Sequence, residues 1–350
     1  MNSLPKRLIR VLVVEDSILM CKVLTTLLNG DPQIVVTAIA TNGKEAVDLV
    51  PHLQPDLITM DMEMPIMDGL EVIKQIMSTH PTPILILSSS VFKKGMEKVF
   101  RAISYGALDV MDKSELVLKG EMNSGEHLIE KVKHLAQKKL PYRIPIEERS
   151  DIFLSASRRT RKTTIHKIVA MVASTGGPQA LLKILKPLPE SFPCGILIVQ
   201  HIATGFLSGL VHWLDKECRI KIKIAEDSEE IRPGVAYIAP ENLQMRVSEG
   251  GRLRLSSEPP ENGHRPSGDV LLESVAEIYG KESIGIILTG MGRDGVRGLK
   301  AIKQKQGKTL AQDEKSCVVF GMPHAAIELG VVDQVLPLER ISEELLSMVN

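Results

Sequence analysis

The sequence has few cysteines, few aromatic residues and no long hydrophobic run. Its 350 residues include four cysteines, one tryptophan and only 3% aromatic residues. The cysteines lack the spacing of metal ligands, which argues against a structural zinc site and favours reduced thiols. No apolar run reaches membrane length, and the short run near the start ends in acidic residues, unlike a signal peptide. We therefore expect a cytoplasmic protein that is not inserted into a membrane.

The chain also has no excess of charge of either sign. Lys and Arg number 43, as do Asp and Glu, so no overall field points to nucleic acid or a membrane as partner. The one basic excess lies in residues 136–165, which hold eight basic and three acidic residues and two prolines. Because its basic run at residues 158–162 is short and has no interleaved aromatic residue, a solvated linker is favoured over a nucleic-acid site. The predicted domains are therefore residues 1–135 and 166–350.

Short apolar runs alternate with helical patterns in the first domain. The predicted strands are residues 8–14, 34–40, 57–60, 84–87 and 108–111. Such alternation predicts an α/β fold, in which a parallel sheet is covered by helices on both faces. Ligands of such sheets bind beyond the carboxyl ends of the strands.

Those strand ends have one chemistry in common. Three carboxylates, one hydroxyl and one cation stand there, namely Glu15, Asp16, Asp61, Ser88 and Lys113. Clustered acids repel one another unless they share a hard cation, and oxygen ligands suit Mg²⁺. A carboxylate beside Mg²⁺ and a lysine can accept a phosphoryl group as an acyl phosphate. The alternative, a set of solvated loop acids, explains each residue alone better than it explains their joint placement.

This domain resembles response-regulator receiver domains, above all in residues 61–69 (DMEMPIMDG). The resemblance implies a flavodoxin-like, doubly wound parallel sheet with Asp61 as the phosphoacceptor. It also implies that Mg²⁺ is held by Glu15, Asp16, Asp61 and the backbone carbonyl of Glu63. Ser88 would be the switch hydroxyl and Lys113 the contact to the phosphate.

Two features of the receiver motif leave questions open. Three serines follow one another at the end of the fourth predicted strand, so Ser89 is the alternative to Ser88. Ser114 stands where receiver domains usually have a proline, which leaves the geometry of the Lys113–Ser114 peptide bond open.

The second domain contains three apolar runs that precede residues suited to hydrolysis. The runs and these residues are 168–173 with Ser174, 195–199 with His201, and 284–288 with Asp294. If the strands are parallel neighbours, their ends meet at one edge of the sheet. Ser, His and Asp would then act as nucleophile, general base and orienting carboxylate. Gly290 and Gly292 would let backbone N–H groups approach a substrate closely.

Each of the three residues also has a structural interpretation. Ser174 is a preferred residue type for the N-cap of the helix that starts near Pro178, and on that stretch alone capping is favoured. His201 would then be a hydrogen-bonded structural residue, and Asp294 would cap the next helix. A different function is also open, because residues 290–295 match the Gly-x-Gly-x-x-Gly fingerprint of nucleotide-dependent oxidoreductases, with Asp313 and Glu314 about 20 residues on.

The second domain resembles the catalytic domain of chemotaxis response-regulator protein-glutamate methylesterases, the CheB family. The matching motifs are residues 173–178 (ASTGGP), 199–201 (VQH), 236–240 (AYIAP), 265–267 (RPS), 288–295 (LTGMGRDG), 311–314 (AQDE) and 319–323 (VFGMP). The resemblance implies Ser174, His201 and Asp294 as the catalytic residues, with the Met291 backbone as oxyanion donor. One departure is residues 241–244 (ENLQ), where the family usually has a histidine, so substrate contacts along that rim stay open.

The combined resemblance implies a phosphorylation-activated serine hydrolase. It would demethylate glutamate methyl esters, and deamidate glutamines, on methyl-accepting chemotaxis receptors during adaptation. A sensor histidine kinase of the chemotaxis pathway would supply the phosphoryl group. Mg²⁺ would serve the receiver, and the esterase would need no cofactor. The remaining alternative is a non-catalytic receiver-output module that acts by protein contact.

Overall fold

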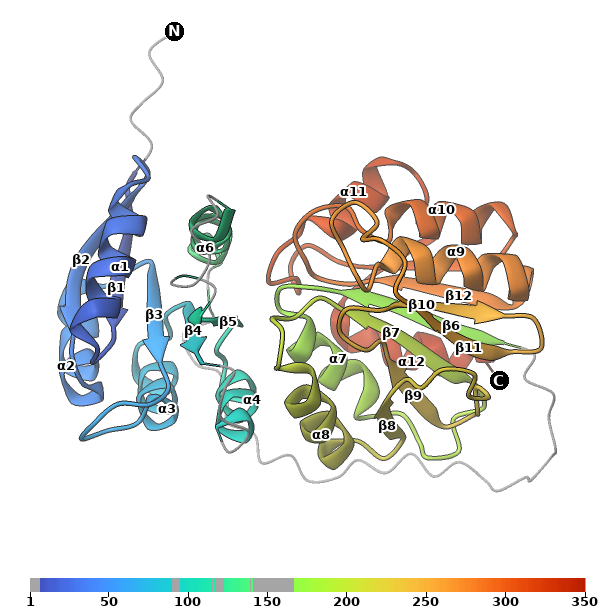
Figure 1. Ribbon diagram of the computed structural model, residues 1–350, viewed down its shortest axis with the longest axis horizontal. Helices are drawn as coiled ribbons and strands as arrows, with labels where there is room; N and C mark the ends of the chain where they lie inside the picture. Colours follow the sequence, from blue (N-terminus) through green and yellow to red (C-terminus); the bar gives the residue numbers. More distant parts are fainter. Residues whose placement is uncertain are drawn as a thin grey trace, which may run out of the picture. The chain divides into compact units, whose positions relative to one another are not determined.

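The computed structural model describes residues 7–89, 95–114, 116, 123–138, 140 and 167–349. Two compact units make up the chain, the first ending in α6 (Asn123–Leu135) and the second beginning with β6 (Ile168–Ala173) (Figure 1). Most of the predicted linker, residues 136–165, lies outside the described residues.

The first unit is built on a five-stranded parallel sheet. Its strands are β1 (Ile9–Val14), β2 (Ile34–Ala40), β3 (Leu57–Asp61), β4 (Ile84–Ser88) and β5 (Asp109–Asp112). They are ordered β2-β1-β3-β4-β5, and every neighbouring pair is parallel. This is the doubly wound order of flavodoxin-like folds. The predicted strands are therefore confirmed, each within one residue at either end.

Three of the five helices described in this unit start at polar side-chain caps. The five are α1 (Ile18–Asn29), α2 (Gly43–Leu53), α3 (Gly69–Thr79), α4 (Met96–Ser104) and α6. The side chains of Ser17, Asn42 and Asp68 accept hydrogen bonds from backbone N–H groups in the first turns of α1, α2 and α3. Such caps stabilise a helix start by about 1 kcal/mol each. They fix where the loops beyond β1 and β3 end.

The second unit is built on seven parallel strands. They are β6, β7 (Gly195–Gln200), β8 (Lys221–Ile224), β9 (Val235–Ile238), β12 (Ser283–Ile287), β13 (Lys308–Gln312) and β14 (Gln334–Leu336). The order is β14-β13-β12-β6-β7-β9-β8, and all neighbouring pairs are parallel. An antiparallel hairpin, β10 (Gln244–Ser248) with β11 (Arg252–Ser256), stands apart from it. The three strands predicted for this domain are β12, β6 and β7, which lie side by side.

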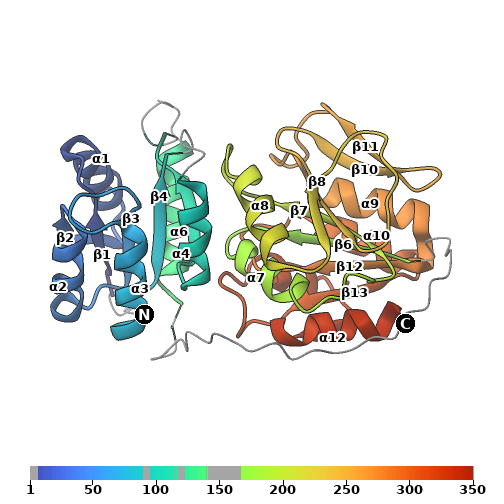
Figure 2. The ribbon, with the colours of Figure 1, turned by 90° about the horizontal axis from the view of Figure 1, so that it is seen from below.

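Helices cover both faces of the seven-stranded sheet. They are α7 (Gly177–Leu185), α8 (Leu207–Glu217), α9 (Gly268–Tyr279), α10 (Val296–Gln304), α11 (Met322–Glu328) and α12 (Leu338–Val349). Figures 1 and 2 show α9 and α10 together on one face and α7, α8 and α12 on the other. Because both faces are covered, β6, β7 and β12 are buried along their whole length, which explains their continuous apolar runs.

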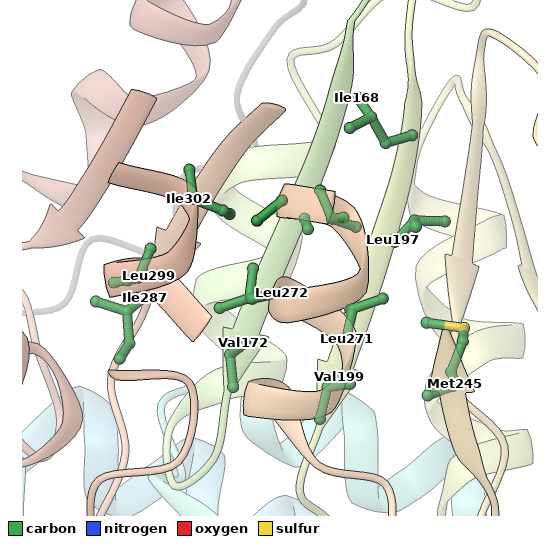
Figure 3. Packing of buried hydrophobic residues seen from close by; sticks show 14 of the residues in the cluster. Ile168, Val172, Leu197, Val199, Met245, Leu271, Leu272, Ile287, Leu299 and Ile302 are labelled. Atoms are coloured by element: carbon green, nitrogen blue, oxygen red, sulfur yellow. The ribbon is translucent and has the colours of Figure 1, made fainter. Parts of the chain in front are cut away.

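The core between the sheet and the α9–α10 pair holds the loop ends in place. Leu272 of α9 and Leu299 and Ile302 of α10 lie over Val172 and Ile287 of the sheet (Figure 3). All five side chains are fully buried. Burial of such a side chain stabilises the fold by about 1.5–3 kcal/mol. The close-packed core thus anchors α9 and α10, whose N-terminal ends lie at the candidate site.

Candidate active site

The ends of β6, β7 and β12 bring three distant parts of the second unit together. Ala173 pairs with Gln200 across β6 and β7, so Ser174 and His201 are the next residues on adjacent strands. The N–H of His201 donates to the carbonyl of Ala173 at 2.9 Å, and the N–H of Ser174 donates to that of Thr289 at 3.0 Å. Main-chain hydrogen bonds therefore fix the start of all three loops relative to one another.

Ser174 lies outside the helix that follows it. The N-cap of α7 is Gly176, whose φ of 78° is in the left-handed region, and this cap has no side-chain hydrogen bond. The interpretation of Ser174 as an N-cap is therefore wrong. Its carbonyl accepts hydrogen bonds from Gly177 N at 2.8 Å and Gln200 Nε2 at 2.9 Å. A Cβ atom at Gly290 would lie 2.7 Å from that of Ser174, so the third loop reaches the serine only because residue 290 is glycine.

Asp294 faces His201 and the start of α9. Its Oδ2 is 2.9 Å from His201 Nε2, and its side chain is only 1% exposed. It accepts hydrogen bonds from Ser267 Oγ at 2.7 Å, Gly268 N at 2.6 Å and Asp269 N at 3.1 Å. The aspartate thus accepts hydrogen bonds from the N-terminus of α9. The N-cap of the next helix, α10, is Gly295, which makes no side-chain hydrogen bond. The interpretation of Asp294 as a cap of the next helix is wrong.

The environment of Asp294 favours its charged form. Burial alone would raise its pKa, but the interaction with His201 and the donors from Gly268 and Ser267 outweigh burial and hold the pKa well below its usual range. The carboxylate is therefore ionised and available to orient an imidazole. Neither ring nitrogen of His201 makes a hydrogen bond of good geometry within the described residues, so the short His201–Asp294 approach is an imperfectly aligned pair.

A second histidine, which the sequence reasoning missed, lies against His201. The rings of His201 and His264 are stacked, with centroids 4.2 Å apart and planes 7° from parallel. Burial, together with the neighbouring His201, lowers the pKa of His264, which keeps this ring neutral near pH 7. The only sequence signal was its position just before the residue 265–267 motif. Ser267 of that motif donates to Asp294, a role that the motif alone did not indicate.

The side chain of Gln244 holds the segment 259–267 in place. This side chain is 1% exposed, and its Nε2 donates to the carbonyls of Pro259 and His264 at 3.2 and 3.1 Å. Its Oε1 accepts from Ser267 N at 2.9 Å. The departure from the family pattern at this position is therefore a buried structural amide that joins the hairpin strand β10 to the loop before α9.

The glycine-rich loop after β12 is bonded to the loop before α11. Gly290 N donates to Val319 O at 3.0 Å, and Gly290 O accepts from Gly321 N and Met322 N. Asp313, the acidic residue of the nucleotide-binding alternative, binds Ser316 instead. Nothing in this arrangement favours a dinucleotide. Met291 follows Gly290 directly and is partly exposed, and its role as oxyanion donor stays a prediction.

In the first unit, the predicted acidic residues meet at the ends of β1 and β3. Lys113 Nζ lies 2.7 Å from Glu15 Oε2 and 2.7 Å from Asp61 Oδ2. Both carboxylates are buried, at 1% and 6% exposure. Asp61 Oδ1 also accepts from Glu63 N at 3.2 Å. The lysine is therefore the counter-ion of two buried acids, whereas Asp16 beside them is exposed.

The donors of this cluster suit a hard divalent cation. Glu15, Asp16 and Asp61 each offer one carboxylate oxygen, and these oxygens lie within 4.8 Å of one another. Burial raises the pKa of Glu15 although the contact with Lys113 opposes the rise. One lysine thus leaves the buried charge incompletely balanced, and an Mg²⁺ ion bound by these oxygens would balance it.

The open points around Ser88 and Ser114 are partly resolved. Ser88 is the last residue of β4, and its carbonyl accepts from Lys113 N at 3.0 Å. Among the described residues the one cis peptide bond is Arg265–Pro266, so the Lys113–Ser114 bond is trans. Ser114 N donates to Asp112 Oδ1 at 2.8 Å. The choice of Ser88 rather than Ser89 as the switch hydroxyl stays a prediction.

The helices that the structure describes include none with the length and apolar character needed to cross a membrane. Two family models match the chain, "Response regulator receiver domain" over residues 11–117 and "CheB methylesterase" over residues 169–345. These ranges contain the acidic cluster and the three converging loops, respectively.

Proteins of known name match nearly the whole chain. A protein-glutamate methylesterase/protein-glutamine glutaminase of Pyrococcus abyssi is 40% identical over 343 residues, covering 96% of this chain and 92% of that protein. One of Salmonella typhimurium is 39% identical over 350 residues, covering 98% and 97%. The crystal structure of the Thermotoga maritima CheB methylesterase catalytic domain is 42% identical, with a TM-score of 0.51 over 52% of this chain and 98% of that one. The chain therefore belongs to the CheB methylesterase family and carries a response-regulator receiver domain ahead of its methylesterase domain.

Proposed function

We propose that the protein is a phosphorylation-activated protein-glutamate methylesterase, and also a protein-glutamine glutaminase, that acts on methyl-accepting chemotaxis receptors. The observation that carries the proposal is that His201 Nε2 lies 2.9 Å from a carboxylate oxygen of the buried Asp294. His201 and Ser174 directly follow two adjacent strands, β7 and β6. The relatives named for both activities, matched over almost their full length, support the proposal.

In the proposed reaction, Ser174 Oγ attacks the ester carbonyl carbon of a glutamate methyl ester. Because Nε2 of His201 faces Asp294, Nδ1 is the ring nitrogen left to accept the serine proton. The imidazolium then protonates the departing methoxide as the C–O bond to it breaks, and methanol leaves. Asp294 stabilises the imidazolium, and the backbone around Met291 would donate to the oxyanion.

The second half of the reaction reverses these roles. A water molecule attacks the acyl-enzyme carbonyl while His201 removes its proton, and Ser174 departs with a proton from the imidazolium. The product is the free glutamate carboxylate. An amide substrate would follow the same path with ammonia in place of methanol, which accounts for a glutaminase activity at the same site.

The receiver domain would control this reaction through Asp61. In this domain, Mg²⁺ would be held by Glu15, Asp16, Asp61 and the backbone carbonyl of Glu63. The ion would neutralise negative charge on an incoming phosphoryl group. Lys113 is already within 2.7 Å of Asp61 and would contact the phosphoryl group. The proposed donor is the sensor histidine kinase of the chemotaxis pathway, and the proposed compartment is the cytoplasm.

The deciding experiment measures methanol release from methylated receptor fragments by the full chain, with and without acetyl phosphate. We expect release that depends on Ser174 and that increases when acetyl phosphate and Mg²⁺ are present. The variant Asp61→Asn should keep the basal rate and lose the increase. Absence of methanol release under all conditions would refute the esterase.

A further inference from the structure

A cavity of about 580 Å³ lies directly beside the proposed triad. Its lining includes Asp294 of the proposed triad, together with His264 and Gly292, which lie beside the triad. His264 is stacked on His201, Asp294 approaches that ring to 2.9 Å, and Gly292 follows Met291. A protein segment whose target side chain reaches Ser174 would therefore lie at this cavity with its neighbouring side chains.

The acidic groups of the cavity are engaged by the protein itself. Asp294 is bound by three donors from the start of α9. Asp269 is 3% exposed, and its Oδ1 accepts from Gly298 N at 2.9 Å. Neither carboxylate presents an unpaired charge to an incoming ligand.

The basic groups of the cavity differ in how they are used. Arg297 is held between Glu273, at 2.5 Å, and Glu261, at 2.8 Å, so two carboxylates balance its charge. Arg293 and Lys300 also line the cavity and are exposed. Within the part of the chain that the structure describes, their charged groups form no hydrogen bond or ion pair. The two charged side chains of this cavity that could pair with a ligand, Arg293 and Lys300, are thus both positive.

We propose that this cavity is a substrate subsite that binds carboxylate side chains flanking the glutamyl ester under attack, with Arg293 and Lys300 as the recognising cations. The inference rests on the proposed function, because hydrolysis of each ester leaves a carboxylate. A segment with several target side chains therefore becomes more acidic with every turnover. Such a segment becomes a better ligand for the cavity, so the enzyme favours esters that stand beside free glutamates.

The test uses two synthetic peptides with one glutamate methyl ester, flanked by glutamates in one and by glutamines in the other. With the full chain at low salt, we expect the glutamate-flanked peptide to have the higher kcat/KM, by about three- to tenfold, through a lower KM, as two exposed ion pairs allow. Raising the salt concentration should reduce the preference. The double variant Arg293→Gln/Lys300→Gln should remove it. Lys305→Gln, which removes an exposed lysine at the end of α10, should leave it intact.

Binding is measured separately, with fluorescent forms of both peptides and the Ser174→Ala protein. Tighter binding of the glutamate-flanked peptide that is lost on neutralising Arg293 and Lys300 supports the subsite. It does so even if the protein with Ser174 intact releases no methanol, an outcome that refutes the proposed function alone. Equal binding and equal kcat/KM for the two peptides, or a preference that survives the double variant, overturns the subsite even where hydrolysis is efficient.

Discussion

The imidazole rings of His201 and His264 are stacked face to face, with their centroids 4.2 Å apart. The loop that carries His264 is fixed by Gln244 and by two backbone hydrogen bonds between Glu261 and His264. Because neither ring nitrogen of His201 makes a well-aligned hydrogen bond among the described residues, this stacking adds to the approach of Asp294 in limiting rotation of the ring. We infer that His264 positions the proposed general base, His201.

Replacing His264 tests this positioning role. His264→Ala should lower kcat by about tenfold with little change in KM, because a misplaced base weakens proton transfer and not substrate binding. His264→Phe keeps a flat ring and should retain activity within about threefold of the parent. Methanol release measured over a range of substrate concentrations separates kcat from KM. A phenylalanine variant as slow as the alanine variant would show that stacking is not what matters.

Removal of the proposed nucleophile gives the most severe prediction. Ser174→Ala should lower methanol release by about 10⁴-fold or more, as expected when the nucleophile of a triad is lost. The same variant should no longer be labelled by a fluorophosphonate probe, while its circular dichroism spectrum stays unchanged. Ser208→Ala, an exposed serine on α8, is the matched control and should behave as the parent. Labelling that persists without Ser174 would move the nucleophile elsewhere.

The sequence predicted the strand ends because local patterns decide them. Ile168 to Ala173 is an apolar run that must be buried, and the polar residue after it must leave the sheet. The same reasoning located Asp61 at the carboxyl end of β3. It failed for the turn at Ser174, where residue-type preference favoured capping, but the chain turns left-handed at Gly176 and leaves the serine outside the helix.

The surroundings of the proposed triad depend on contacts that no local pattern encodes. His264 stacks on His201 and Ser267 donates to Asp294. Both stand on a loop that is positioned by Gln244, a buried amide that resembles a polar surface residue in the sequence. The short strands β8, β9, β13 and β14 were not predicted, since runs of three to five residues have little periodicity of their own. Tertiary packing decides such elements.

Phosphorylation at the acidic cluster is tested by direct labelling. The full chain should take up one phosphoryl group from acetyl phosphate, only when Mg²⁺ is present, and hydroxylamine should release it as it does other acyl phosphates. Asp61→Asn should abolish the label because the acceptor oxygen is gone. Asp48→Asn, at an exposed position on α2, should not affect it. Uptake that is insensitive to a chelator would contradict the Mg²⁺ site.

The buried Asp269 predicts a stabilising substitution. Burial raises its pKa, although the hydrogen bond from Gly298 N opposes the rise. A carboxyl group whose pKa is higher in the folded than in the unfolded chain destabilises the fold when ionised. That penalty is fully present above the folded pKa and disappears as the pH falls below the unfolded value of about 3.9. Asp269→Asn should therefore raise the Tm at pH 7, by about 2–4 °C for each kcal/mol gained.

Asp333 is expected to show the opposite pH dependence of stability to that of Asp269. Burial alone would raise its pKa, but Lys303 and Thr309 outweigh burial and lower it. Its ionised form therefore stabilises the fold above the unfolded pKa, and this contribution is lost as the pH falls through the folded pKa. Asp333→Asn should lower the Tm at pH 7, and both differences from the parent should shrink toward pH 3 in thermal unfolding followed by circular dichroism. A lower Tm for Asp269→Asn at pH 7 would mean that the charge of Asp269 is needed to hold α10 against α9, and the burial argument for this residue would be wrong.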